Sequence, residues 1–309
     1  MTQVQEQFLP STGTHRLHLC LWEPDCPPKG ILQISHGMCE YILRYDHFAR
    51  WLAQQGWVVA GSDHLGHGTT ASSPEDLGHF QPQDPSRQVV EDLYTVSRWL
   101  REKYPQLPLF LMGHSMGSFL ARRYAMTYGD SLAGLIIMGT GSQPSFLVYS
   151  GLLLTKLIGL FRGQRYRSPL LYSMTLGSYN RAFAPNRTSC DWLSKNTENV
   201  DQYLKDPLCQ FQFTVNGYHT LLSTLAFIQS PKNIARLPRE LPIFLVAGDQ
   251  DPVGNMGKGV LQVYQLYRTR CSQVECKLYP GLRHEILNET ERMEVYQDIL
   301  TWLENHLKG

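Results

Sequence analysis

Residues 107–125 read LPLFLMGHSMGSFLARRYA. The apolar run over 107–112 predicts a buried strand, and the pattern that follows Ser118 predicts a helix. Between them stands Gly113-His114-Ser115-Met116-Gly117, a G-x-S-x-G motif in the strand–turn–helix context of a nucleophile elbow. So tight a turn leaves almost no room for side chains two residues before and after the serine, and glycine occupies both positions. The stretch therefore predicts a strained turn that exposes the Ser115 hydroxyl, which is strong support for a serine hydrolase.

A serine nucleophile needs a carboxylate and a histidine, which follow it in that order in this type of fold. Residues 242–247 predict a buried strand that runs into Asp249 and Asp251, at the strand end where α/β sheets place their sites. Asp251 is the preferred acid, because the proline after it favours an extended or turn conformation. Asp249 is expected to bond turn amides instead.

The histidine is expected in a loop after the last strand. Residues 273–279 alternate like a strand, His284 follows them, and a helix is predicted over 293–307. Taken alone, His284 would be an ordinary loop histidine and Asp251 a turn residue. Because Ser115, Asp251 and His284 come in the right order, each just past a strand, they are predicted to form a catalytic triad.

An oxyanion hole requires two backbone N–H groups directed at the developing negative charge. One is expected from Met116, the residue after the nucleophile, and the other from Met38, in the turn after a strand over 30–35. Glu40 and Arg44 lie beside this turn. They either pair and brace it or remain two solvated charges, and an exposed pair would contribute only ~0–1 kcal/mol.

Composition excludes several other functions. The chain has 309 residues, with 28 basic against 27 acidic side chains, and shows no basic footprint for nucleic acid. Residues 1–7 lack the pattern of a secretory signal, and no uncharged apolar stretch is long enough to span a bilayer. Seven cysteines without C-x-x-C spacing fit reduced thiols and a cytoplasmic location. Asp63, His64 and His67 are plausible metal ligands, but a glycine-rich turn explains them better, so neither a metal nor a cofactor is expected.

Strands and helices alternate through the first part of the chain, which predicts a mostly parallel sheet flanked by helices on both faces. The expected strands cover 16–22, 30–35, 57–61, 109–112 and 133–138, and the expected helices cover 44–55 and 89–104. Between about 141 and 231 the pattern becomes purely helical. We therefore expect a core of residues 1–141 and 231–309 with a helical cap, residues 142–230, inserted over the serine.

The apolar segment 146–161 within this cap has two compatible interpretations. It is either a plain core helix of the cap, or it lines an acyl tunnel and rests on a lipid surface, with the following arginines meeting phosphates. Phe146, Leu153 and Leu157 are the candidate acyl-chain contacts, and the cap is a candidate for transient, peripheral membrane contact.

Several motifs together resemble one known family. They are His36-Gly37-x-x-Glu40, Asp63-His64-x-Gly66-His67-Gly68, Gly113-His114-Ser115-Met116-Gly117, Asp251-Pro252-Val253-Gly254 and His284-Glu285-Ile286-Leu287. In combination they are similar to the monoacylglycerol lipase and lysophospholipase group of α/β-hydrolases, also called serine aminopeptidase-like. The resemblance implies an α/β-hydrolase fold with an inserted cap that admits lipid or associates with a membrane, the triad named above, and Met38 and Met116 as oxyanion donors. Ser118 stands where this group often has glycine.

Three functions compete. The first is hydrolysis of carboxylic esters, with single-acyl lipids such as monoacylglycerol or lysophospholipid, or a related small ester, as the substrate. The second is amide or peptide hydrolysis, since the same triad cleaves both kinds of bond. The third is a non-enzymatic ligand receptor, against which the complete triad argues.

Overall fold

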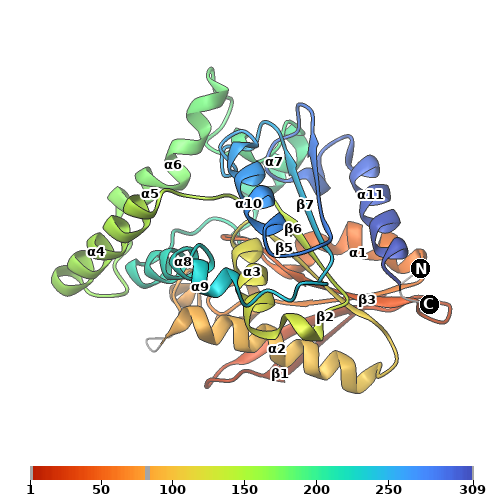
Figure 1. The fold of residues 1–309 in the computed structure, drawn as a ribbon. Helices are drawn as coiled ribbons and strands as arrows, with labels where there is room; N and C mark the ends of the chain where they lie inside the picture. Colours follow the sequence, from red (N-terminus) through yellow and green to blue (C-terminus); the bar gives the residue numbers. More distant parts are fainter. Residues whose placement is uncertain (1–2, 81–83, 308–309) are drawn as a thin grey trace.

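A computed structural model of the chain, shown in Figure 1, describes residues 3–80 and 84–307. Residues 1–2, 81–83 and 308–309 lie outside the described residues. They include both ends of the predicted core. They also include the first two residues of the segment 1–7, for which the sequence predicts no secretory signal.

One sheet forms the centre of the molecule, with its eight strands in the order β1-β2-β4-β3-β5-β6-β7-β8. The strands are β1 (Val4–Pro10), β2 (Arg16–Trp22), β3 (Gly30–Ser35), β4 (Trp57–Ser62), β5 (Leu109–His114), β6 (Gly134–Met138), β7 (Ile243–Gly248) and β8 (Val274–Tyr279). From β4 to β8 every neighbouring pair is parallel, whereas β1 and β2 are antiparallel to their neighbours. The predicted mostly parallel sheet is confirmed.

The prediction that Arg16 begins the sheet is wrong, because β1 precedes it as an edge strand paired with β2. Its sequence, VQEQFLP, has no buried apolar alternation, and of its side chains only that of Leu9 is buried. An edge strand with one solvated face does not need such a pattern, so the usual signal is missing.

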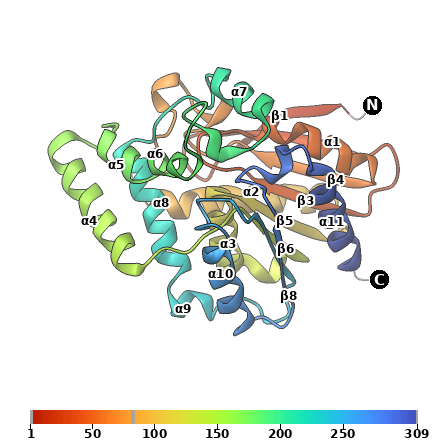
Figure 2. The same ribbon diagram turned by 90° about the horizontal axis from the view of Figure 1, so that it is seen from above.

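Helices cover both faces of the sheet, as Figure 2 shows from above. They are α1 (Asp46–Gln54) and α11 (Arg292–Asn305) on one face, and α2 (Pro85–Lys103), α3 (Met116–Tyr128) and α10 (Lys258–Arg268) on the other. Side chains alternate between the two cores along each central strand. On β5, Leu111 packs with the α2–α3 side, and Phe110 and Met112 pack with the α1–α11 side. A strand buried on both faces is continuously apolar, which is why these strands are recognisable in the sequence.

The cap is a set of helices between β6 and β7. They are α4 (Ser145–Arg162), α5 (Pro169–Met174), α6 (Leu176–Tyr179), α7 (Thr197–Lys205) and α8 (Val215–Ile228), and the short helix α9 (Pro231–Ile234) follows before β7. Short 3-10 helices complete the described chain: η1 (Ile42–Tyr45), η2 (Gly68–Thr70), η3 (Pro74–Asp76), η4 (Gly129–Ser131), η5 (Asn180–Phe183), η6 (Asp191–Leu193) and η7 (Ile286–Asn288). Helix α8 lies between α3 and the outermost helix α4 (Figures 1 and 2). The boundary residues of the cap stay a prediction.

Helix α4 is the described segment that bears on membrane spanning. It is long and apolar enough, by length and composition alone, to cross a membrane. No membrane span was predicted here, because the helix contains Lys156 and ends at Arg162. In the structure one face of α4 packs along α8, while Phe146 and Phe161 elsewhere on the helix are 71% and 79% exposed. Helix α4 is thus held by protein along one face and exposes apolar side chains elsewhere.

Candidate active site

The nucleophile elbow lies at the carboxyl end of β5. Ser115 has φ 54° and ψ −123°, a backbone conformation that non-glycine residues rarely adopt and that is typical of functional sites. A Cβ atom on Gly113 would overlap the carbonyl oxygen of Gly117, and one on Gly117 would overlap that of Ser35. Both glycines are therefore required where β5, α3 and the end of β3 meet, and this packing holds Ser115 in its strained conformation.

The structure brings Asp251 to His284. His284 Nδ1 donates to Asp251 Oδ2 over 2.9 Å, and both side chains are buried. The other oxygen of Asp251 accepts from the Val253 amide at 2.8 Å, which fixes the carboxylate. Asp249 instead accepts from the Gly281 amide at 2.8 Å, as expected of a turn residue. With Nδ1–H committed to Asp251, His284 Nε2 is the nitrogen left to take a proton.

Ser115 and His284 line one cavity of about 330 Å³ between the sheet and the cap. Trp192 lines it too, with its ring centroid 5.1 Å from that of His284. The cavity is small and mostly apolar, and the expected nucleophile and base are both on its wall. This is the arrangement of a small-molecule catalytic site.

The two expected oxyanion donors also line this cavity. Within the described chain, the amides of Met38 and Met116 donate no hydrogen bond to a protein group. The loop that carries Met38 passes close to the nucleophile, since a Cβ atom on Gly37 would lie 3.0 Å from Cβ of Ser115. Two free N–H groups beside a nucleophile can bind a developing oxyanion.

The acyl-chain contacts predicted on α4 need correction. Phe146, Leu153 and Leu157 are 71%, 59% and 46% exposed, and none of them lines the cavity. The side chains of α4 that do line it are Leu147, Val148, Ser150 and Leu154. Because both faces of α4 are apolar, the helical period could not show which one points inward.

Helix α8 supplies a part of the cavity wall that the sequence analysis missed. Its contribution is Tyr218, Leu221, Leu222 and Leu225. These apolar residues recur at spacings of three and four, a signal that was available in the sequence. Further lining residues come from α5 and α6, namely Leu171, Met174, Leu176 and Tyr179.

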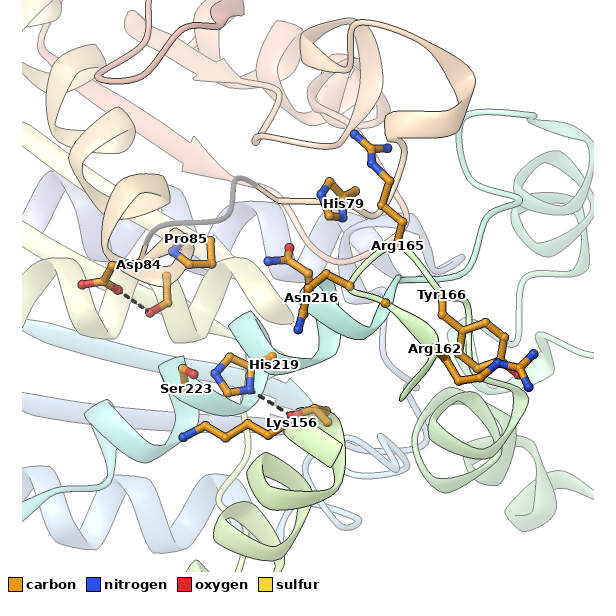
Figure 3. Close-up of a pocket in the computed structure, with 14 residues that line it drawn as sticks. His79, Asp84, Pro85, Lys156, Arg162, Arg165, Tyr166, Asn216, His219 and Ser223 are labelled. Carbon is orange, nitrogen blue, oxygen red and sulfur yellow. Dashed lines mark hydrogen bonds between the residues drawn. The ribbon is translucent and has the colours of Figure 1, made fainter. Parts of the chain in front are cut away.

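A second, larger cavity of about 700 Å³ lies apart from this site (Figure 3). Helices α4 and α8, the segment 163–166 and the start of α2 line it, and it shares no lining residue with the Ser115 cavity. Its rim carries Lys156, Arg162 and Arg165, and His219 is held there by Thr155 Oγ1, 2.9 Å from its Nδ1. Most of the lining surface of this recess is apolar, and Lys156, Arg162 and Arg165 add positive charge to it.

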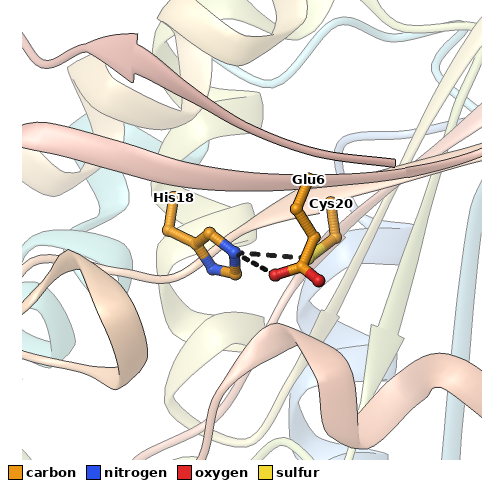
Figure 4. Close-up of side chains that lie close together, drawn as sticks. All are labelled: Glu6, His18 and Cys20. Atoms are coloured by element: carbon orange, nitrogen blue, oxygen red, sulfur yellow. Dashed lines mark hydrogen bonds and ion pairs between the residues drawn. The ribbon is translucent and has the colours of Figure 1, made fainter. Parts of the chain in front are cut away.

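The one group of residues in the described chain with metal-ligand spacing is Glu6, His18 and Cys20, shown in Figure 4. His18 Nδ1 donates to Asp63 at 2.8 Å and Nε2 donates to Glu6 at 2.8 Å. Burial, the largest single influence, lowers the pKa of His18, but the hydrogen bonds to Asp63 and Cys20 and the charges of these two groups together outweigh it and raise the pKa to about 11. A protonated imidazole has no lone pair for a metal, so this group fits an ion pair that ties β1 and β2 to the turn after β4.

The histidines of that turn are neutral, unlike His18, because burial is the largest influence on their pKa values and is not offset. Burial lowers the pKa of His64 to about 3 and that of His67 to about 4. Asp63 is committed to His18 and to the amides of Ile42 and Thr69. The turn is a structural element, as the sequence analysis preferred.

Glu40 and Arg44 form a buried pair, so the alternative of two solvated charges is wrong. Arg44 Nη1 lies 3.2 Å from Glu40 Oε2, with side-chain exposures of 10% and 5%. Arg44 also donates to both oxygens of Glu285, at 2.7 and 2.9 Å. Glu285 and His114, whose Nδ1 lies 3.1 Å from Glu40 Oε1, belong to this group as well, which was not predicted from the sequence. The sequence held one signal for them: the ionisable His114 directly precedes Ser115, and the ionisable Glu285 directly follows His284.

Comparison with known proteins shows the family and the fold of the chain. The family model described as serine aminopeptidase, S33, matches residues 26–291. A monoacylglycerol lipase of Mycolicibacterium smegmatis is 28% identical over 98% of both chains, and the monoglyceride lipase of Mus musculus is 26% identical over 93% of this chain and 86% of its own. The crystal structure of a carboxyl esterase from Bacillus coagulans, in complex with glycerol, superposes with a TM-score of 0.91 at 31% identity over the whole of both chains. The chain therefore belongs to the serine aminopeptidase S33 family, and its core has the α/β-hydrolase fold.

Proposed function

We propose that this protein is a carboxylic ester hydrolase that cleaves single-acyl lipids, such as a monoacylglycerol or a lysophospholipid, through a Ser115–His284–Asp251 triad. The observation that carries the proposal is the convergence of a strained serine, a carboxylate-bound histidine and two free amides on one apolar cavity. The similarity to enzymes named monoacylglycerol lipase and monoglyceride lipase supports the choice of substrate.

In this proposal His284 Nε2 takes the proton of Ser115 as its oxygen attacks the ester carbonyl. Asp251 stabilises the imidazolium, and the amides of Met38 and Met116 bind the oxyanion. As the tetrahedral intermediate collapses, His284 gives its proton to the alcohol that leaves, and an acyl-enzyme forms. Water, deprotonated by His284, then attacks the acyl-enzyme and releases the fatty acid together with free Ser115.

The size and lining of the cavity favour one acyl chain. Its volume, about 330 Å³, is at the low end of the range for small-molecule sites. Leu147, Val148 and Leu154 of α4 and apolar residues of α8 both line it, so an acyl chain there would contact apolar side chains of two helices. A lipid with two or three chains would need room outside this cavity.

The acids of the cavity argue against the amide or peptide alternative. A peptidase that recognises a free amine needs an unpaired carboxylate beside the nucleophile. Glu40 and Glu285 are the acids among the described lining residues, and Arg44 binds both. The cap acids are committed elsewhere as well: Asp191 accepts from the Thr188 hydroxyl, and Asp206 accepts from Tyr41 at 2.7 Å.

We further propose a cytoplasmic protein that meets membranes peripherally through α4. Support comes from the exposed apolar side chains of α4 and from the basic residues near its end. The exposed set is Phe146, Leu147, Tyr149, Leu153, Leu157, Leu160 and Phe161. Lys156, Arg162 and Arg165 on the rim of the second cavity would face anionic headgroups.

Two assays test the proposed function. A fluorophosphonate probe should label the protein, with the mass increase on the peptide that contains Ser115. A panel of p-nitrophenyl esters of rising chain length, set beside aminoacyl anilides, should then show ester cleavage that increases with chain length. Absence of labelling would favour a non-enzymatic receptor. Preference for anilides would favour a peptidase, and a flat chain-length profile would favour a small-ester esterase.

A further inference from the structure

Four ionisable side chains form a buried group behind the candidate active site, called the charge cluster below. Its members are Glu40, Arg44, His114 and Glu285. They come from three separate segments: the turn after β3 with η1, the end of β5, and the loop after β8. These same segments carry Met38, Ser115 and His284. The charge cluster is therefore the place where the three parts of the site are joined.

Hydrogen bonds show that Glu40 is ionised. Its Oε2 accepts from Arg44 Nη1 at 3.2 Å. Its Oε1 accepts from the hydroxyl of Tyr45 at 2.9 Å and from the amide of Gly37. Burial alone would raise the pKa of Glu40, but the hydrogen bond from His114 and the charge of Arg44 lower it below its usual value. A carboxylate that receives this many donors has no proton of its own to donate.

Both ring nitrogens of His114 then face groups that can only accept. Nε2 lies 3.2 Å from the backbone oxygen of His284, and a carbonyl oxygen has no proton to give. Nδ1 lies 3.1 Å from Oε1 of the ionised Glu40. Each nitrogen must therefore carry a hydrogen, which makes the ring an imidazolium. With His114 protonated, the charge cluster holds two cations and two anions, so its net charge is zero, as deep burial demands.

We infer that His114 is a positioning residue that acts as a buried, protonated bridge between the oxyanion loop and the loop of His284. This inference rests on the proposed function. The bridge runs from the backbone oxygen of His284, through the imidazolium, to the Glu40 carboxylate that holds the Gly37 amide next to Met38. Loss of the Nδ1 proton would set a nitrogen lone pair against Glu40. Glu40 and the oxyanion donors beside it would then move out of position.

The bridge has a defined pH dependence. Burial alone would lower the pKa of His114, but its hydrogen bond and ion pair with Glu40, with the charge of Glu285, raise the pKa above the usual 6.5. The titratable and charged groups around it are His36, Glu40, Arg44 and Tyr45 from the end of β3 and the segment after it, and His284 and Glu285 from the loop after β8. Burial raises the pKa of Tyr45 far above 10, so Tyr45 keeps its proton through the same range.

The sign of the effect follows directly. His114 keeps its proton below its raised pKa and loses it as the pH rises through that value, so the positioning it provides is lost on the alkaline side. Turnover should thus have an alkaline limb that belongs to His114.

The direct test is a nitrogen-15 NMR spectrum of the full-length protein with labelled histidine, recorded at pH 7 without substrate and assigned by loss of signal in His114→Gln. We expect the His114 ring to show a proton on both nitrogens. A neutral ring with a single N–H would overturn the inference. Because this spectrum needs no turnover, it stands or falls separately from the proposed function, which is tested by probe labelling.

The kinetic test compares His114→Gln with His219→Gln, a matched change at a histidine of the second cavity. The glutamine amide does not titrate. His114→Gln should lower kcat about tenfold, equivalent to ~1.4 kcal/mol in the barrier, with little change in KM. It should also flatten the alkaline limb, whereas His219→Gln should retain the wild-type profile. An alkaline limb that persists in His114→Gln would contradict the assignment.

Discussion

Leu154 and Leu153 are adjacent on α4 but face opposite environments, which makes them a matched pair for testing the acyl-chain wall. Leu154 lines the Ser115 cavity, whereas Leu153 is 59% exposed and does not line it. Leu154→Asp would remove an apolar contact worth roughly 1.5–3 kcal/mol to a chain that fills the cavity, and would add a carboxylate there. We expect kcat/KM for a dodecanoyl ester to fall about 10- to 100-fold.

The size of this loss should depend on the length of the acyl chain. Each buried methylene contributes at most ~0.8 kcal/mol, or about fourfold in kcat/KM, so the wild-type profile should rise with chain length until the cavity is full. An acetyl ester is too short to reach Leu154 and should lose about twofold or less, and Leu153→Asp should affect neither ester. The assay is a kcat/KM series from acetyl to dodecanoyl p-nitrophenyl esters for the three proteins. Equal losses at all chain lengths, or a larger loss in Leu153→Asp, would refute this view of α4.

Three further predictions follow from the site and its surroundings. Asp251→Asn should reduce kcat about 10⁴-fold, because an amide cannot stabilise the His284 imidazolium. Asp249→Asn should reduce kcat much less. Reversed effects in steady-state assays would show that the acid is misassigned. Gly117→Ala should lower the free energy of unfolding by about 1–3 kcal/mol or prevent folding, because its methyl group would overlap the backbone oxygen of Ser35; an unchanged urea midpoint would contradict this packing. His18 has a pKa raised to about 11, so its contribution to stability is complete below pH 6.5 and is lost as the pH rises toward 11. The variant His18→Gln should therefore lack that part of the decline in Tm at alkaline pH. An identical decline in the variant would argue against the ion pair.

Local patterns were sufficient for much of the fold. Strands β3 to β7 are buried on both faces and are therefore mostly apolar, and the two elbow glycines reflect backbone contacts that no side chain could tolerate. The order of Ser115, Asp251 and His284, each after a strand, was enough to predict that they would meet. By contrast, β1 is a polar edge strand and α4 is apolar on two faces, so their periodicity carried too little information.

The charge cluster could not be predicted because its contacts join residues far apart in the chain. Arg44 and Glu285 are separated by 241 positions, and Glu40 and His114 by 74. A charged residue in a sequence is a solvated surface group far more often than a buried partner. Only the fold shows that these four residues share one largely buried site, so the protonation of His114 follows from hydrogen-bond partners rather than from sequence pattern.

The central claim is that Ser115 is the nucleophile, and the most direct measurement is the turnover of a monoacylglycerol by Ser115→Ala. The substitution removes one oxygen from a side chain on the wall of the cavity and leaves the elbow glycines in place, so the variant should fold and keep a Tm close to that of the wild type. We predict that kcat falls by roughly 10⁴- to 10⁶-fold, because members of a triad act as a unit. A folded Ser115→Ala protein that retains more than about a tenth of the wild-type kcat would contradict it.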